Sequence, residues 1–174
     1  QTPYLVDTAD HLKKIAGMVA GGNSLKGVVF KLTGNIALPE DWYPIGELSE
    51  SGVGHKFFSG IIDGDNHLLT VPEGGRPLLE LTRDAVVRNL EIFGIRIEGA
   101  GLHDKVVVDY GDDGVYTQFN EPDVITVENV TLKEGSKTLG SGLVNGGFNS
   151  GDNNIFIKNC TIEKNVVVGY DKTQ

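Results

Sequence analysis

The sequence predicts an all-β protein built as a parallel β-solenoid, with one α-helix capping its N-terminal end. Three observations favour this fold. Apolar residues alternate with a period of two from residue 26 onward, three segments share one six-residue pattern, and residues 7–22 show helical periodicity. With 174 residues and 39% hydrophobic content, the chain is long enough for one domain with its own core. We therefore expect a single domain over residues 1–174.

Residues 7–22 are expected to form the cap helix, because six apolar residues fall on one helical face: Ala9, Leu12, Ile15, Ala16, Val19 and Ala20. Asp7 is the expected N-cap, and Gly21 and Gly22 are expected to end the helix. The apolar face of the helix would cover the core and the strand edge at the first end of the solenoid.

Strands are expected from residue 26 onward, in coils that occupy residues 26–174. Residues 60–71 read GIIDGDNHLLTV, which predicts two short strands around an Asp-Gly turn. Three later segments, residues 87–92, 127–132 and 157–162, share one pattern: apolar, charged, Asn, apolar, polar, apolar. The alternation changes parity at each Asn, so a flat strand would turn its second half to the wrong face.

A sharp corner at the charged residue and the Asn would turn both arms of each segment inward. Asn tolerates the left-handed backbone conformation that such a corner requires. Corners stacked on one another generate a solenoid, in which we expect the Asn amides to be buried and hydrogen-bonded between coils. The alternative is an antiparallel β-sandwich, which gives no reason for a repeated parity change at Asn.

The three corner residues, Asn89, Asn129 and Asn159, are separated by more residues than one regular coil contains. Solenoid coils usually have about 20–30 residues, so we expect insertions near residues 101–122 and 134–153. The chain ends at Gln174, soon after the apolar run VVVG, in what looks like the middle of a solenoid. We expect either a fragment of a longer protein or a last strand edge that a partner covers.

The net charge excludes several classes of partner. A charge of −9 and a pI near 4.8 disfavour nucleic acid and anionic membrane surfaces. No apolar run approaches the ~20 residues of a membrane-spanning helix, so no membrane insertion is expected.

Several short motifs resemble bacterial surface β-helix proteins that carry GLUG-type repeats. FKLT at residues 30–33, WYPIG at 42–46 and DGDNH at 63–67 follow the expected cap helix in the order typical of that family. The stretch SGLVNGGFNSG, followed by IKNCTIEKNVVVG, resembles the repeat itself. Two features depart from the pattern: Asn66 stands where the family often has a second Gly, and one insertion between coils is longer.

The resemblance implies a right-handed parallel β-helix that is secreted or displayed on a bacterial cell surface, often as a module of a large protein. We accordingly expect a non-catalytic, adhesin-like scaffold that binds an extracellular glycan or a host or cell-surface protein, without a cofactor. A purely structural stalk or assembly module, which self-associates at its open C-terminal edge, is a second interpretation.

An acidic cluster is a candidate for chemistry: Asp109, Asp112 and Asp113, in the segment DYGDDG. Paired carboxylates can hydrolyse glycosides and carboxylates can bind Ca²⁺, whereas a solvated acidic turn does neither. Polygalacturonase-like β-helix hydrolases also have Gly-His-Gly and Arg-x-Lys elements downstream, which this chain lacks after Asp113. The rival hypothesis is therefore a polysaccharide lyase or hydrolase with the rest of its site beyond Gln174.

Three aromatic residues in the same segment are candidates for stacking against sugar rings: Tyr110, Tyr116 and Phe119. The other interpretation is that they hold that insertion in place. Arg83, Arg88 and Arg96 lie near one another in the sequence, and we expect them to be solvated surface charges, with Arg88 at a corner.

Overall fold

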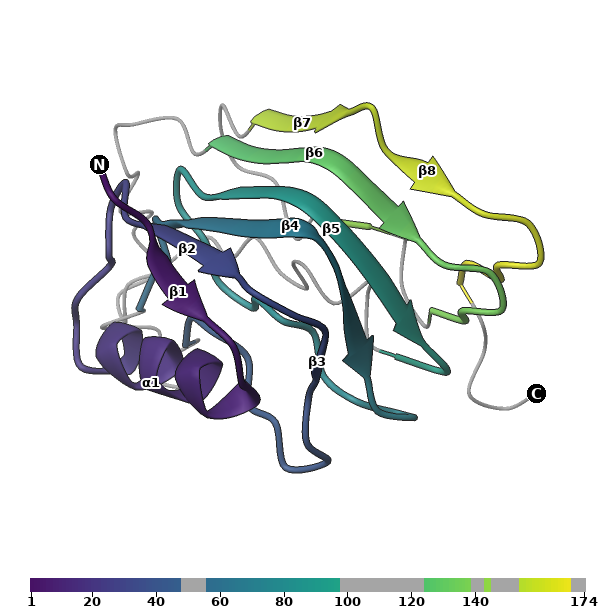
Figure 1. Ribbon diagram of the computed structural model, residues 1–174, viewed down its shortest axis with the longest axis horizontal. Coiled ribbons are helices and arrows are strands. Elements are labelled where there is room, and N and C mark those ends of the chain that lie inside the picture. The colour runs from purple at the N-terminus through teal and green to yellow at the C-terminus, as the bar shows by residue number, and fades with distance from the viewer. Residues whose placement is uncertain (48–55, 98–123, 139–142, 145–153, 170–174) are drawn as a thin grey trace, which may run out of the picture.

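The computed structural model describes residues 1–47, 56–97, 124–138, 143–144 and 154–169. These ranges contain one helix, α1 (Ala9–Ala20), at the N-terminal end of a sheet (Figure 1). The strands of the sheet are β1 (Tyr4–Val6), β2 (Val29–Leu32), β3 (Ile36–Ala37), β4 (Ile61–Val71), β5 (Val86–Gly94), β6 (Val124–Leu132), β7 (Asn154–Lys158) and β8 (Thr161–Ile162).

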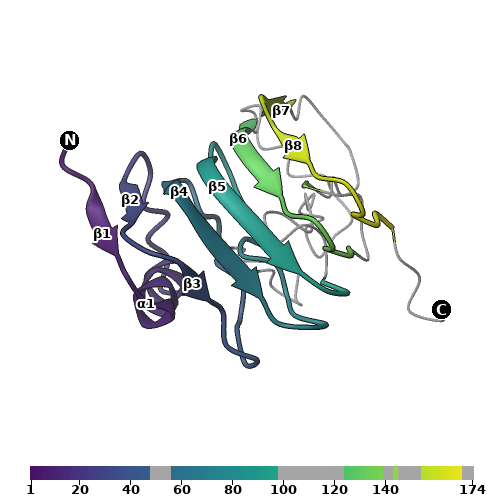
Figure 2. The ribbon, with the colours of Figure 1, turned by 45° about the vertical axis from the view of Figure 1, so that its right-hand side comes forward.

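The eight strands pair in parallel and in sequence order, β1-β2-β4-β5-β6-β7, with β3 beside β4 and β8 beside β6. Figure 2 shows this succession from β1 at the N-terminal end to β7 and β8 at the C-terminal end. The prediction of an all-β chain with parallel strands is confirmed. An antiparallel sandwich is wrong for these strands.

Further bridges join segments outside the named strands. Four are parallel, Ile45–Leu79, Phe58–Thr82, Ile97–Thr138 and Lys137–Val167, and one, Glu47–Lys56, is antiparallel. Two of the parallel bridges include Lys137 and Thr138, which belong to the insertion expected at 134–153. The insertion expected at 101–122 lies outside the described residues.

The three predicted corners are present. Asn89, Asn129 and Asn159 have φ angles of 53°, 52° and 50°, which is the left-handed conformation. In β5, in the residue before it and in β6, the apolar residues on both sides of the Asn are buried: Ala85, Val87, Leu90, Ile92, Ile125, Val127, Val130 and Leu132. The change of parity at Asn therefore keeps one continuous face of each bent strand on the core.

β4 contains the same kind of corner, where an Asp-Gly turn between two strands was expected. Ile61–Val71 is one strand, and its pairing with β5 shifts between Asp63 and His67. Asp65 and Asn66 take up the left-handed conformation there, with φ of 47° and 62°. Both halves of β4 pair in parallel with β5, so the prediction of a turn was wrong and β4 is a bent strand like its neighbours.

The corner side chains form a hydrogen-bonded ladder across three strands. Asn129 Nδ2 donates to Asn89 Oδ1 at 2.9 Å, and Asn89 Nδ2 donates to Asp63 Oδ1 at 3.2 Å. The predicted hydrogen bonding between corners is thus confirmed for β4, β5 and β6. The prediction that the amides are buried is wrong, because Asn89 is half-buried and Asn129 and Asn159 are exposed. The corner points outward, away from the apolar core, and its amides lie on the surface.

The N-cap of helix α1 lies one residue later than expected. Thr8 is the N-cap, with an extended backbone and a side chain that accepts a hydrogen bond from the His11 amide, so the assignment of Asp7 was wrong. Of the predicted face, Leu12, Ile15 and Val19 are buried in the core, whereas Ala9 and Ala16 are half-buried and Ala20 is exposed. The helix ends at Gly21, whose amide donates to the Gly17 carbonyl.

The strand register aligns apolar side chains into columns that cross the sheet. One column contains Tyr4, Phe30, Ile62, Val87, Val127 and Ile157. Its four inner members are buried, whereas Tyr4 in β1 and Ile157 in β7 are exposed. Strand β1, which the sequence pattern did not predict, and strand β7 are the two ends of this path of paired strands.

The corner at Asn89 provides a stability test. Asn89→Gly loses the two amide hydrogen bonds and should lower the free energy of unfolding by about 1–2 kcal/mol. Asn89→Ala loses the same bonds. Ala also has no polar side chain to offset the steric cost of a Cβ in the left-handed region, which lowers the free energy of unfolding by about 1–2 kcal/mol more. Urea titration followed by circular dichroism should rank wild type above Gly and Gly above Ala. An Ala variant as stable as the Gly variant would contradict this account of the corner.

Candidate functional site

The six residues proposed from the sequence as binding or metal residues fall in a range outside the described residues. They are Asp109, Tyr110, Asp112, Asp113, Tyr116 and Phe119, all within 98–123. The expected sugar-stacking and calcium roles of these residues therefore stay predictions. Within the described ranges, no three His, Cys, Asp or Glu side chains gather as a metal site would require.

A different site lies beside the C-terminal end of α1. It is a pocket of about 360 Å³, a volume in the range of small-ligand sites. Its lining includes three basic side chains, one carboxylate, two hydroxyls and one aromatic ring: Lys26, Lys56, Arg83, Asp84, Ser24, Ser59 and Phe57. We call this site the basic pocket. With three cations and one carboxylate, the pocket is locally positive, although the net charge of the chain is −9.

Backbone hydrogen bonds bring the walls of the basic pocket together from three separate segments. The Ser59 amide donates to the Ser24 carbonyl at 2.8 Å, and the Gly27 amide donates to the Ser59 carbonyl at 3.1 Å. On the other side, the Arg83 amide donates to the Phe58 carbonyl at 2.9 Å. The three segments therefore stack on one another just before β2, β4 and β5, and this stacking sets the positions of Lys26 and Arg83.

Two residues in the segments that supply the basic pocket have unusual backbone conformations. Leu25 and Asp84 have φ angles of 56° and 54°, in the left-handed region that disfavours residues with a Cβ. The Asn23 side chain stabilises the first of these by accepting a hydrogen bond from the Leu25 amide at 3.0 Å. Such strain costs about 1–3 kcal/mol per residue and is concentrated at functional sites.

The cations of the basic pocket are held in different ways. A Cβ added to Gly22 would lie 3.8 Å from Lys56 Nζ, so this ammonium lies against the C-terminal end of α1, where the helix dipole favours positive charge. The Arg83 guanidinium lies 4.2 Å from the centre of the Phe57 ring, and Arg83 is half-buried. The expectation that Arg83 is a solvated surface charge was therefore wrong.

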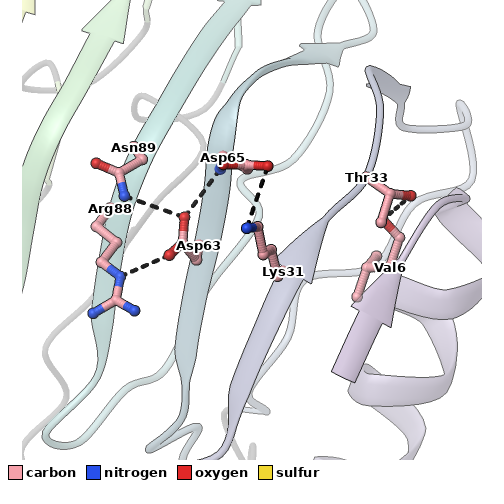
Figure 3. A network of polar contacts seen from close by, with 7 residues as sticks. All are labelled: Val6, Lys31, Thr33, Asp63, Asp65, Arg88 and Asn89. Atoms are coloured by element: carbon pink, nitrogen blue, oxygen red, sulfur yellow. Dashed lines mark hydrogen bonds and ion pairs between the residues drawn. The ribbon is translucent and has the colours of Figure 1, made fainter. Parts of the chain in front are cut away.

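A row of charges crosses the outer face of the sheet at the corners. Arg88 Nε donates to Asp63 Oδ2 at 2.9 Å, and Lys31 lies 3.4 Å from Asp65 (Figure 3). Burial by itself raises the pKa of the Asp63 carboxyl, but hydrogen bonds from the Asp65 amide, Arg88 and Asn89 outweigh it and lower the pKa. Arg88 is therefore a partly exposed surface charge that is paired within the corner ladder. Charged Asp63 stabilises the corner until the pH falls through its lowered pKa.

A second polar cluster links the other arms of β5, β6 and β8. Lys133 Nζ lies 3.5 Å from Glu91 and 3.0 Å from Glu163. The Glu163 carboxylate also accepts a hydrogen bond from the Glu134 amide at 2.7 Å. That backbone bond and Lys133 lower the pKa of Glu163, and the bond to Glu163 raises the pKa of Lys133. These groups lie on the surface, so we assign them a role in strand alignment and not in binding.

Sequence reasoning missed the basic pocket, because its residues are far apart in the chain. One signal could have found two of them. Lys26 stands three residues before Val29, the first residue of β2, and Arg83 stands three residues before Val86, the first residue of β5. Both strand starts are in register with the same residue of β4. Once the register is known, the two cations fall at equivalent positions of the segments before β2 and β5, on either side of the segment before β4.

The helix of the described ranges is too short and too polar to cross a membrane. Comparisons of the chain with protein-family models, with curated proteins and with solved structures found no match.

Proposed function

We propose that the chain is a right-handed parallel β-helix that serves as a non-catalytic scaffold on a bacterial cell surface or in the secreted fraction. Its support is the sequence-ordered parallel sheet, the hydrogen-bonded side chains of Asp63, Asn89 and Asn129 at the stacked corners, and the second set of parallel bridges. Right-handed connections are the rule between parallel strands of one sheet. The adhesin-like role comes from the resemblance of the sequence motifs to surface β-helix proteins.

The scaffold binds an acidic glycan through the basic pocket. The observation that carries this proposal is the grouping of Lys26, Lys56 and Arg83 in one small-ligand-sized pocket of an acidic protein. Carboxylate or sulfate groups on a sugar are the natural counter-charges for ammonium and guanidinium groups. Ser59 adds a hydroxyl for sugar hydroxyl groups, and Phe57 adds an apolar surface for the ring.

Removing the two pocket lysines should weaken binding of an acidic oligosaccharide. Charged hydrogen bonds contribute about 1.5–3 kcal/mol each, so Lys26→Ala with Lys56→Ala should raise the Kd for oligogalacturonate or a sulfated oligosaccharide at least about tenfold. Calorimetry at two salt concentrations measures this, and binding should weaken as salt rises. Neutral oligosaccharides of equal length should bind more weakly than acidic ones.

The matched control is Lys13→Ala with Lys14→Ala, which removes the same charge from the exposed side of α1. This control should leave the Kd within about twofold of wild type. Equal losses in both double variants would mean that net charge, and not the pocket, governs binding. Release of unsaturated oligosaccharides during the titration would favour the rival lyase function, for which the pocket would supply the basic groups.

A further inference from the structure

Within the described ranges, strands β7 and β8 form an open edge of the sheet. On the side away from β6, neither pairs with another strand of the described ranges. An edge strand leaves backbone N–H and C=O groups available to a further strand. The apolar residues of this edge, Ile155, Ile157 and Ile162, are 41%, 53% and 52% exposed, although their register partners in β6 are buried: Ile125, Val127 and Leu132.

The charges on the outer face alternate in sign from strand to strand. The register places these residues in one row across β2, β4, β5, β6 and β7: Lys31, Asp63, Arg88, Glu128 and Lys158. We call this row the charged column. Neighbouring parallel strands lie about 4.8 Å apart, so each charge in the column is next to one of opposite sign. The column ends on a cation, Lys158, which is exposed and lies over the Phe156 ring at 5.5 Å.

We propose that the β7–β8 edge binds an extended segment of a partner protein as a further parallel strand, with a carboxylate in register with Lys158. The segment presents apolar side chains beside Ile155 and Ile157, which covers the exposed end of the core. An Asn after the carboxylate would lie beside Asn159, which has the same left-handed conformation as Asn89 and Asn129. In such strand addition at a sheet edge, hydrogen bonds between the two backbones provide the affinity, and alternate side chains of the added strand provide the specificity.

A second copy of this chain fits the edge less well than such a partner. The opposite end of the path is β1, which contributes Leu5 to the position of the charged column. Stacking β1 of a second copy on β7 in the same register would therefore place Leu5 beside Lys158, without a counter-charge. The charged column thus selects a segment with Asp or Glu at this position.

The test uses a capped peptide with the sequence of residues 124–133, VITVENVTLK, which already pairs with β7 on its other side. It is compared with the same peptide carrying Glu128→Lys, against the full chain and its Lys158→Glu and Lys158→Ala variants. Wild type should bind the Glu peptide about five- to tenfold more tightly than the Lys peptide. The Glu peptide places an opposite charge beside Lys158, whereas the Lys peptide places a like charge there. Lys158→Glu should reverse this preference, and Lys158→Ala should reduce it to within about twofold.

Fluorescence anisotropy gives the affinities, and hydrogen exchange should show protection of the β7 amides by the Glu peptide. Circular dichroism checks that the Lys158 variants fold, which is expected for an exposed side chain. Equal affinity of wild type for both peptides, or binding of neither, would overturn the proposal. Sedimentation that shows dimers of the wild-type chain and monomers of Lys158→Glu would also overturn it, because a second copy would then occupy the edge. The pocket variants of Lys26 and Lys56 should leave these affinities unchanged, so this test is independent of glycan binding.

Discussion

Replacing Gly46 by Ala is expected to destabilise the fold by about 2–6 kcal/mol, because backbone strain and overpacking act together at this position. Gly46 has a φ of +93°, which residues with a Cβ rarely adopt. A Cβ there would collide with the Leu81 carbonyl oxygen and would lie 2.8 Å from the Leu81 nitrogen. These are backbone atoms, which cannot move aside as a flexible side chain would.

The contact cannot relax cheaply, because the segments around Gly46 are held together on both sides. The Ile45 amide donates to the Leu78 carbonyl and the Glu80 amide donates to the Ile45 carbonyl, both at 2.9 Å. Ile45 and Leu79 are fully buried. A total stability of about 5–15 kcal/mol is usual for a domain, so urea titration of Gly46→Ala should show a greatly lowered midpoint or an unfolded chain.

Gly17→Ala is the matched control for this prediction. Gly17 lies on the exposed side of α1, and a Cβ there would meet nothing within 4 Å. Ala is the better helix former by about 0.5–1 kcal/mol, so this variant should be slightly more stable than wild type. A Gly46→Ala variant as stable as Gly17→Ala would mean that the two stacked segments are not packed as described.

The corners could be predicted from the sequence because one residue type satisfies two local requirements at once. Asn both tolerates the left-handed conformation and supplies an amide for its neighbours, and the change of parity at Asn89 and Asn129 marks the corner directly. The corner in β4 was missed because Asp63-Gly64 is also the commonest signal of a hairpin turn. Its glycine has another cause: a Cβ on Gly64 would lie 2.8 Å from the Leu90 Cα of β5.

The basic pocket and strand β1 could not be predicted by the same reasoning. β1 has three residues, two of them exposed apolar side chains, so its pattern contains no inward–outward alternation to recognise. The pocket depends on which segments stack, and hence on the strand register. Register between parallel strands is a long-range property that local spacing does not contain. The shared six-residue pattern aligns Arg88, Glu128 and Lys158 of the charged column, but only the register adds Lys31 and Asp63 to it.

Truncating Ile92 to Ala should be the second of the large effects, with a loss of about 2–5 kcal/mol of unfolding free energy. Ile92 lies in β5 and is fully buried, and its register partners Leu69 and Leu132 cover it on both sides. Removing three methyl or methylene carbons there loses their transfer free energy and leaves a cavity that the neighbouring strands cannot fill. The milder Ile92→Val should cost about 0.5–1.5 kcal/mol.

The same substitution at Ile162 is an internal control, because Ile162 occupies the same column two strands later. It is 52% exposed at the open edge, so Ile162→Ala removes carbons that water already contacts and should cost less than about 1 kcal/mol. Urea midpoints at equal slope measure the difference between the two variants. Binding of an acidic strand at the edge would cover Ile162 and make the bound protein more sensitive to Ile162→Ala than the free chain. An Ile162→Ala variant that is as destabilised as Ile92→Ala, without any ligand, would show that this edge is already covered and would refute both the open edge and the docking proposed for it.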